Sequence, residues 1–126
     1  MKYQKFYFVL ISLLLVTLSV SAFTAGSSAK SDFPTGKFTS ASDKFIRYEF
    51  NEDNTWAYVD AGMISADGSY DVKGNQWIEN GTEECPFPGT YEWSFDGTNL
   101  SFKLVGEDKC EARKAATDGQ TFVLVK

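Results

Sequence analysis

The chain contains no histidine. Without an imidazole it lacks the usual general base near neutral pH, the Ser/His and Cys/His nucleophile pairs, and any imidazole-ligated zinc or haem site. Basic residues are also few, with 12 Lys and Arg against 17 Asp and Glu and a formal net charge of −5. Binding of nucleic acid depends on clustered Lys and Arg that neutralise phosphates. We therefore expect no nucleic-acid partner.

The acidic residues give little support for an enzyme. Nearly all of the candidate carboxylates fall in predicted turns or loops, where Asp is a local hydrogen-bonding turn former; they are Asp53, Asp60, Asp67, Glu83, Glu84, Asp96, Glu107, Asp108 and Asp118. No Asp-x-Asp-x-Asp-Gly calcium loop occurs. We expect no catalytic residues, no metal and no cofactor. The enzymatic alternative left open is an isomerase or cyclase of the barrel type that acts by shaping its substrate.

Cysteine is scarce too, since Cys85 and Cys110 are the only two. The first 84 residues contain none, which excludes a lipid-modified cysteine near the N-terminus. In an exported chain the two cysteines are expected to pair as a structural disulfide. The alternative is a redox-active or metal-binding pair, but 24 intervening residues are far from a C-x-x-C spacing, and two thiols alone make a poor zinc site.

Residues 1–22 have the pattern of a secretory signal peptide. Lys2 and Lys5 precede an apolar run over 6–20, and the small residues Ser21 and Ala22 suit cleavage. The alternative is a permanent helical membrane anchor, since the run approaches the roughly 17–25 residues of a spanning helix. Cleavage predicts a secreted or periplasmic protein without stable membrane insertion. It also removes two lysines and no acid, which lowers the formal charge from −5 to −7.

The remaining chain divides into a leader and one domain. Residues 23–33 are rich in Ser, Ala, Gly and Thr and predict a flexible leader, and the domain covers 34–126. Within the domain, apolar residues alternate with polar ones between regularly spaced turns, as in short antiparallel strands. The clearest case is 89–105, where Asp96-Gly97 predicts a tight hairpin. Trp93 lies mid-strand there and is expected to be well buried.

One segment breaks this alternation. Asp108 with Glu111 resembles a helix N-cap, good helix formers follow, and Asp118-Gly119 stops them, so a short helix is predicted over 108–117. The domain is thus all-β with seven or eight strands and one helix. Closing an up-and-down antiparallel meander into a barrel removes exposed strand edges, which favours a barrel over the alternative, a flattened sandwich.

Several segments resemble a known family. They are Thr35-Gly36-Lys37-Phe38, the Gly-x-Tyr hairpins, Cys85, Gly89-Thr90-Tyr91-Glu92-Trp93-Ser94-Phe95-Asp96-Gly97, Leu100-Ser101-Phe102 and Asp108-Lys109-Cys110-Glu111-Ala112-Arg113. Together they resemble small exported bacterial lipocalin-like (calycin-type) proteins of mostly unassigned function. The resemblance covers most of 34–126 and implies an up-and-down barrel that can hold one small ligand.

Two readings of the inward face follow. It carries the aromatic residues Trp56, Tyr58, Tyr70, Tyr91, Trp93, Phe95 and Phe102. These side chains either line a pocket for a small apolar or amphipathic ligand or fill the barrel themselves. Three alternatives follow for Arg113: it closes one end of the barrel, it binds the anionic head group of a ligand, or it pairs with a carboxylate of the protein. The predicted function is an exported, non-enzymatic ligand-binding protein. The alternative is a compact interaction or envelope-structural module whose protein partner is unknown.

Overall fold

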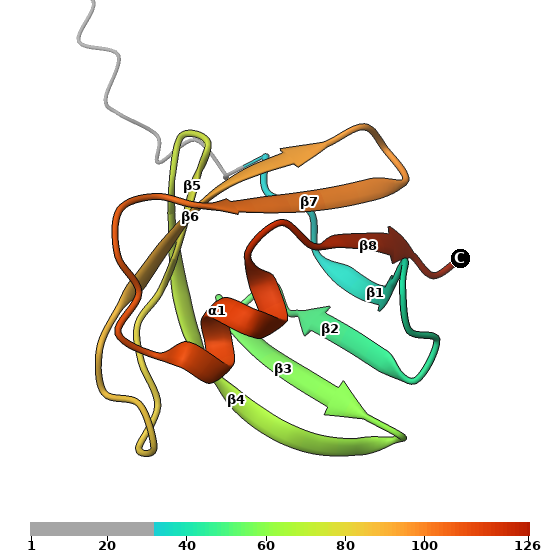
Figure 1. Ribbon diagram of the computed structural model, residues 1–126. Coiled ribbons are helices and arrows are strands. Elements are labelled where there is room, and N and C mark those ends of the chain that lie inside the picture. Colours follow the sequence, from blue (N-terminus) through green and yellow to red (C-terminus); the bar gives the residue numbers. More distant parts are fainter. Residues whose placement is uncertain (1–31) are drawn as a thin grey trace, which may run out of the picture.

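The computed structural model describes residues 32–126 as a closed antiparallel barrel of eight strands with one short helix (Figure 1). The elements are β1 (Gly36–Ser40), β2 (Ile46–Phe50), β3 (Thr55–Asp60), β4 (Met63–Lys73), β5 (Gln76–Glu79), β6 (Gly89–Phe95), β7 (Asn99–Leu104), α1 (Glu111–Thr117) and β8 (Thr121–Leu124). Each strand pairs with the next, and β8 pairs with β1 to close the ring. The predicted all-β barrel is confirmed. The signal peptide over 1–22 and the leader up to residue 31 lie outside the described residues.

The β6–β7 hairpin shows how the local sequence sets the register. The Asp96 carboxylate accepts hydrogen bonds from the backbone N–H groups of Thr98 at 2.9 Å and Asn99 at 2.7 Å. Gly97 has a φ of 98°, which a residue with a side chain rarely adopts. Trp93 consequently pairs with Phe102, and the predicted apolar faces of both strands point into the barrel.

The helix α1 is three residues shorter at its start than predicted. It begins at Glu111 after Cys110, because Asp108 does not cap it and instead lies buried against Arg113. Its end after Thr117 agrees with the predicted stop at Asp118-Gly119. Thr117 hydrogen-bonds the Tyr48 hydroxyl at 2.8 Å, which fastens α1 across one end of the barrel (Figure 1).

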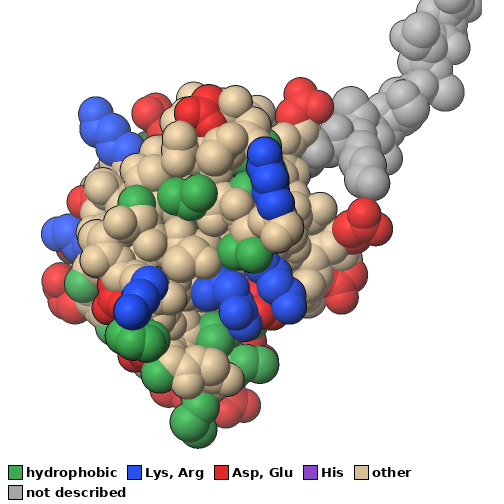
Figure 2. Space-filling model, turned by 90° about the vertical axis from the view of Figure 1, so that its right-hand side faces the viewer, with side chains coloured by type: hydrophobic (Ala, Val, Ile, Leu, Met, Phe, Trp, Pro, Cys, Tyr) green, Lys and Arg blue, Asp and Glu red, His purple; other side chains and the backbone are tan. Residues whose placement is uncertain are grey.

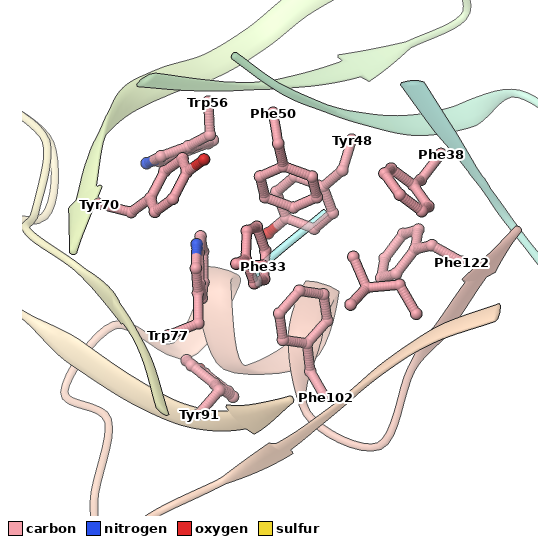
Figure 3. Close-up of a cluster of buried hydrophobic side chains, with 11 residues drawn as sticks. Phe33, Phe38, Tyr48, Phe50, Trp56, Tyr70, Trp77, Tyr91, Phe102 and Phe122 are labelled. Carbon is pink, nitrogen blue, oxygen red and sulfur yellow. The ribbon is translucent and has the colours of Figure 1, made fainter. Parts of the chain in front are cut away.

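The barrel interior is filled mainly by aromatic rings, which we call the aromatic core (Figure 3). It comprises Phe33, Phe38, Tyr48, Phe50, Trp56, Tyr70, Trp77, Tyr91, Leu100, Phe102 and Phe122. Most ring pairs are edge to face or tilted, as with Phe33 against Phe50 at a centroid distance of 5.1 Å, and Tyr48 stacks on Phe50 at 5.2 Å. Side chains therefore occupy most of the space that a larger barrel leaves for a ligand.

Two expectations about this interior were wrong. Phe33, assigned to the flexible leader, is only 5% exposed and contacts five rings of the barrel, so the domain begins before residue 34. Trp93 is half-buried, since its indole lies at the barrel rim and donates to the Gly74 carbonyl at 3.2 Å. Trp77, which the alternation alone did not single out, is fully buried instead.

The outer surface carries one group of exposed hydrophobic side chains. Phe45 precedes β2, and Met63 and Ile64 begin β4; Met63 is 75% exposed. A hydrogen bond from Ala61 N–H to the Phe45 carbonyl brings the two turns together. Figure 2 shows hydrophobic side chains among Lys and Arg side chains on the side of the barrel where the C-terminus lies. Within residues 32–126, no helix is long and apolar enough to span a bilayer.

Candidate functional site

Three charged side chains lie buried at the α1 end of the barrel, and we call them the charged cluster. Glu79 closes β5, Asp108 precedes α1, and Arg113 projects from α1 between them. Arg113 Nη2 is 2.6 Å from Asp108 Oδ1, Arg113 Nε is 2.8 Å from Asp108 Oδ2, and Arg113 Nη1 donates to Glu79 Oε2. Arg113 Nη2 also donates to the Phe87 carbonyl at 2.8 Å. The arginine thus joins a strand, a loop and the helix.

The carboxylates of the charged cluster are satisfied by other donors as well. Glu79 Oε1 accepts from the Gly81 N–H at 2.8 Å, and Asp108 Oδ1 accepts from the Cys110 N–H at 2.8 Å. The Tyr91 hydroxyl donates to Asp108 Oδ2. Every side-chain nitrogen and oxygen of Glu79, Asp108 and Arg113 therefore has a hydrogen-bond partner.

The pKa shifts follow from these contacts. Burial opposes ionisation of Asp108, but hydrogen bonds from Arg113 and Tyr91 outweigh it and hold the pKa below its ordinary value. Burial likewise opposes the charge of Arg113, and its bonds to Asp108 and Glu79 outweigh that effect and raise its pKa. Burial and the bond to Asp108 raise the pKa of Tyr91. Asp108 and Arg113 are thus charged, and Tyr91 is a neutral donor, at neutral pH.

Gly89 is the residue that makes room for the charged cluster. A Cβ at this position would lie 2.7 Å from both Arg113 Nε and Asp108 Oδ2. A side chain there would displace the ion pair, because real Cβ atoms do not approach other atoms so closely. The absence of a side chain at the first residue of β6 therefore leaves the space that the ion pair occupies.

A pocket of about 320 Å³ lies between the charged cluster, the barrel wall and α1, and we call it the α1 pocket. Its lining comprises Tyr48, Trp56, Tyr58, Ser65, Ala66, Glu79, Thr82, Glu84, Cys85, Cys110, Ala112, Arg113 and Ala116. Glu79 and Tyr48 are buried, whereas Ser65, Glu84 and Ala112 are exposed, so the pocket runs from the interior to the surface. Alanines on β4 and α1 leave the space that aromatic residues fill elsewhere.

Aromatic rings form one wall of the α1 pocket. Tyr48 packs edge to face with Tyr58 at a centroid distance of 5.0 Å and with Trp56 at 6.0 Å. Burial raises the pKa of Tyr48 and also that of Tyr58, which is less deeply buried. Both phenols are therefore neutral near pH 7. The wall is therefore apolar with hydroxyl groups at its margin.

Trp56 contributes its ring to this wall, whereas its indole nitrogen is buried against Gly68. Its side chain is only 5% exposed, and no described residue accepts a hydrogen bond from its buried Nε1. Gly68 faces this indole, since a Cβ there would lie 3.2 Å from Nε1. Arg47 Nε and Trp77 Nε1 are likewise buried donors without an acceptor among the described residues, and Trp77 lies within the aromatic core.

A disulfide joins Cys85 and Cys110 beside the α1 pocket, with their Cα atoms 5.9 Å apart. The predicted pairing is confirmed. The bond ties the loop before β6 to the residue before α1 and so holds two sides of the pocket together. Closing a loop of this length stabilises the fold by about 3.5 kcal/mol in the chain-entropy account.

The residues predicted to bind a ligand do not form one site. Trp56, Tyr58 and Arg113 line the α1 pocket. Trp93 and Phe102 instead border a second hollow of about 340 Å³ near Asn75 and Lys103. Tyr70 and Tyr91 belong to the aromatic core and line neither space, and Phe95 packs against the core beside Phe38.

Sequence reasoning missed Glu79 and Tyr48 as site residues. A signal for Glu79 existed, because it lies two positions after Trp77 and so shares its inward face. Of the roles considered for Arg113, the structure shows pairing with carboxylates at the barrel end; its three side-chain nitrogens already donate within the protein.

The fold and the site define a small closed antiparallel barrel with a charged cluster and a pocket under its one helix. The chain matches no protein-family model, no curated protein and no solved structure.

Proposed function

We propose that this protein is an exported, non-enzymatic binding protein that holds a small amphipathic molecule in the α1 pocket, and that it is a lipocalin-like (calycin-type) barrel. The observation that carries the proposal is a pocket of about 320 Å³ that is lined by the rings of Tyr48, Trp56 and Tyr58 and runs from the barrel interior to the surface. Ligand pockets typically measure roughly 300–1,000 Å³ and combine apolar walls with a few polar groups. The α1 pocket fits the lower end of that range.

The aromatic core limits the size of the ligand. Phe33, Phe50 and Trp77 fill the centre of the barrel, where lipocalin-like barrels have room for a ligand (Figure 3). A long acyl chain would have to displace these rings, whereas a molecule of one or two rings fits between Tyr58 and α1.

Export is the second part of the proposal. It is supported by the signal-like segment over 1–22 and by a disulfide, which persists in oxidising compartments and is rare in the cytosol. A cell fractionation with an antibody to the protein tests it: the mature chain is expected in the periplasm or medium.

Two alanines of α1 provide a matched pair of variants that tests ligand binding. Ala112 and Ala115 are both exposed on this helix, but only Ala112 is among the residues that line the α1 pocket. Ala112→Trp should fill the mouth of the pocket, and Ala115→Trp is the matched control. Saturation-transfer NMR with a panel of one-ring and two-ring amphipathic molecules should show transfer in the wild type and Ala115→Trp and lose it in Ala112→Trp.

Native mass spectrometry of protein purified from its host complements this panel, with a retained small molecule as the expected result. Absence of both a retained molecule and any transfer would contradict ligand binding. The second candidate function, an interaction module, would then be favoured, because Phe45, Met63 and Ile64 form an exposed apolar group that a protein partner could cover. A Met63→Ser, Ile64→Ser variant should lose that partner in a pull-down.

A further inference from the structure

The α1 pocket carries more negative than positive charge. Its charged lining residues are Glu79, Glu84 and Arg113, and Asp108 lies directly behind Arg113. One guanidinium therefore stands against three carboxylates. Four hydrogen bonds within the protein use four of the five N–H groups of Arg113, so little of its donor capacity remains for an anionic ligand.

The aromatic wall is the second feature of the pocket. Burial raises the pKa of Tyr48, so its phenol is neutral near pH 7. Rings of Trp and Tyr attract cations through their quadrupoles, and Trp56, Tyr48 and Tyr58 all line the same space.

The carboxylates lie at two depths in the pocket. Glu79 is almost completely buried, and Glu84 is exposed on the loop before β6. That loop is held tightly, since Thr82 N–H donates to the Cys85 carbonyl at 2.9 Å and Cys85 N–H donates to Thr82 Oγ1 at 3.2 Å. These bonds fix the loop that carries Glu84 at the mouth of the pocket.

We propose that the ligand of the α1 pocket is a small organic cation, an aromatic or alkyl amine, whose ammonium group lies between the Tyr48, Trp56 and Tyr58 wall and the carboxylates. This inference rests on the proposed ligand-binding function and specifies the chemical class of the ligand. The apolar part of the amine packs against the alanines of α1, and the charge faces the acidic side of the pocket.

Three probes of similar shape separate charge from apolar fit: phenethylamine, 2-phenylethanol and 3-phenylpropionate. Isothermal titration near neutral pH is expected to show phenethylamine, which is protonated, binding at least about tenfold more tightly than 2-phenylethanol. The anionic 3-phenylpropionate is expected to bind most weakly. Added salt should weaken the binding of phenethylamine and leave that of 2-phenylethanol unchanged.

Glu84 and its neighbour Glu83 supply a matched pair of variants, because both are exposed and only Glu84 lines the pocket. Glu84→Gln should weaken phenethylamine binding about two- to fivefold without affecting 2-phenylethanol, and Glu83→Gln should change neither. Equal binding of the three probes, with no effect of Glu84→Gln, would overturn the cation proposal and leave the pocket proposal standing. Absence of binding by all three, with no retained molecule in native mass spectrometry, would overturn both.

Discussion

The aromatic core and the charged cluster occupy the same barrel interior with opposite chemistry. Trp77 and Glu79 are two residues apart on one face of β5 and are 0% and 1% exposed. Trp77 packs against four other rings of the core within 6.1 Å, whereas Glu79 depends on Arg113 and the Gly81 N–H. The aromatic core is stabilised by buried apolar area and close packing, whereas the charged cluster is stabilised by particular hydrogen bonds and ion pairs. Two equally buried residues can therefore respond very differently to substitution.

The largest effect is expected in the aromatic core. Trp77→Ala should lower the free energy of unfolding by up to about 5 kcal/mol, the upper end for truncating a buried aromatic residue. Trp93→Ala, at the half-buried rim, should cost only about 1–2 kcal/mol. Urea denaturation of both variants measures the contrast. Equal costs would show that the rim belongs to the same tightly packed region as the centre.

Removing the arginine should be nearly as damaging. Arg113→Met leaves Glu79 and Asp108 buried without their counter-ion and should cost about 3–5 kcal/mol. Adding Glu79→Gln and Asp108→Asn removes the stranded charges and should restore part of that loss, measured by the same denaturation. If the triple variant were less stable than Arg113→Met, charge pairing would not be what the cluster contributes.

A smaller effect is expected from crowding the cluster. Gly89→Ala places a Cβ within 2.7 Å of the Arg113 and Asp108 side chains and should cost about 1–3 kcal/mol. Ser94→Ala, at an exposed position of the same strand, should change stability by less than about 0.5 kcal/mol. Thermal denaturation compares them. A Gly89→Ala variant as stable as the parent would show that the ion pair can shift.

The pH dependence gives the smallest effect in this comparison: the aromatic core has no group that titrates in acid, whereas the charged cluster contains Asp108. The pKa of Asp108 is lower in the folded protein than in the unfolded chain, so its contribution is complete above the unfolded value of about 4 and is lost as the pH falls through the folded pKa. Asp108→Asn should flatten the acid loss of stability. Asp67→Asn, at an exposed site on β4, is the control and should keep the parental slope.

The positions of the strands were largely predictable, whereas the composition of the site was not. Alternation placed Tyr91, Phe102 and Leu100 inside the barrel, where they are buried. It also placed Trp93 inside, but strand geometry says only which face a side chain occupies and not how close it lies to the barrel end. Phe33 was missed because no periodic pattern surrounds it; only the closed ring of strands creates the space that it fills.

The sequence by itself determined the all-β class, the hairpin at Asp96-Gly97, the stop of α1 at Asp118 and the pairing of the two cysteines, because each depends on local geometry or on simple counting. The tertiary structure alone decided that Asp108 pairs with Arg113 and not with its own helix, and that Glu79 joins them from a strand 34 residues away. It also decided which aromatic residues line the α1 pocket and which fill the barrel. These outcomes depend on closure of the barrel, which brings distant side chains together at one end and sets the free volume that remains between them.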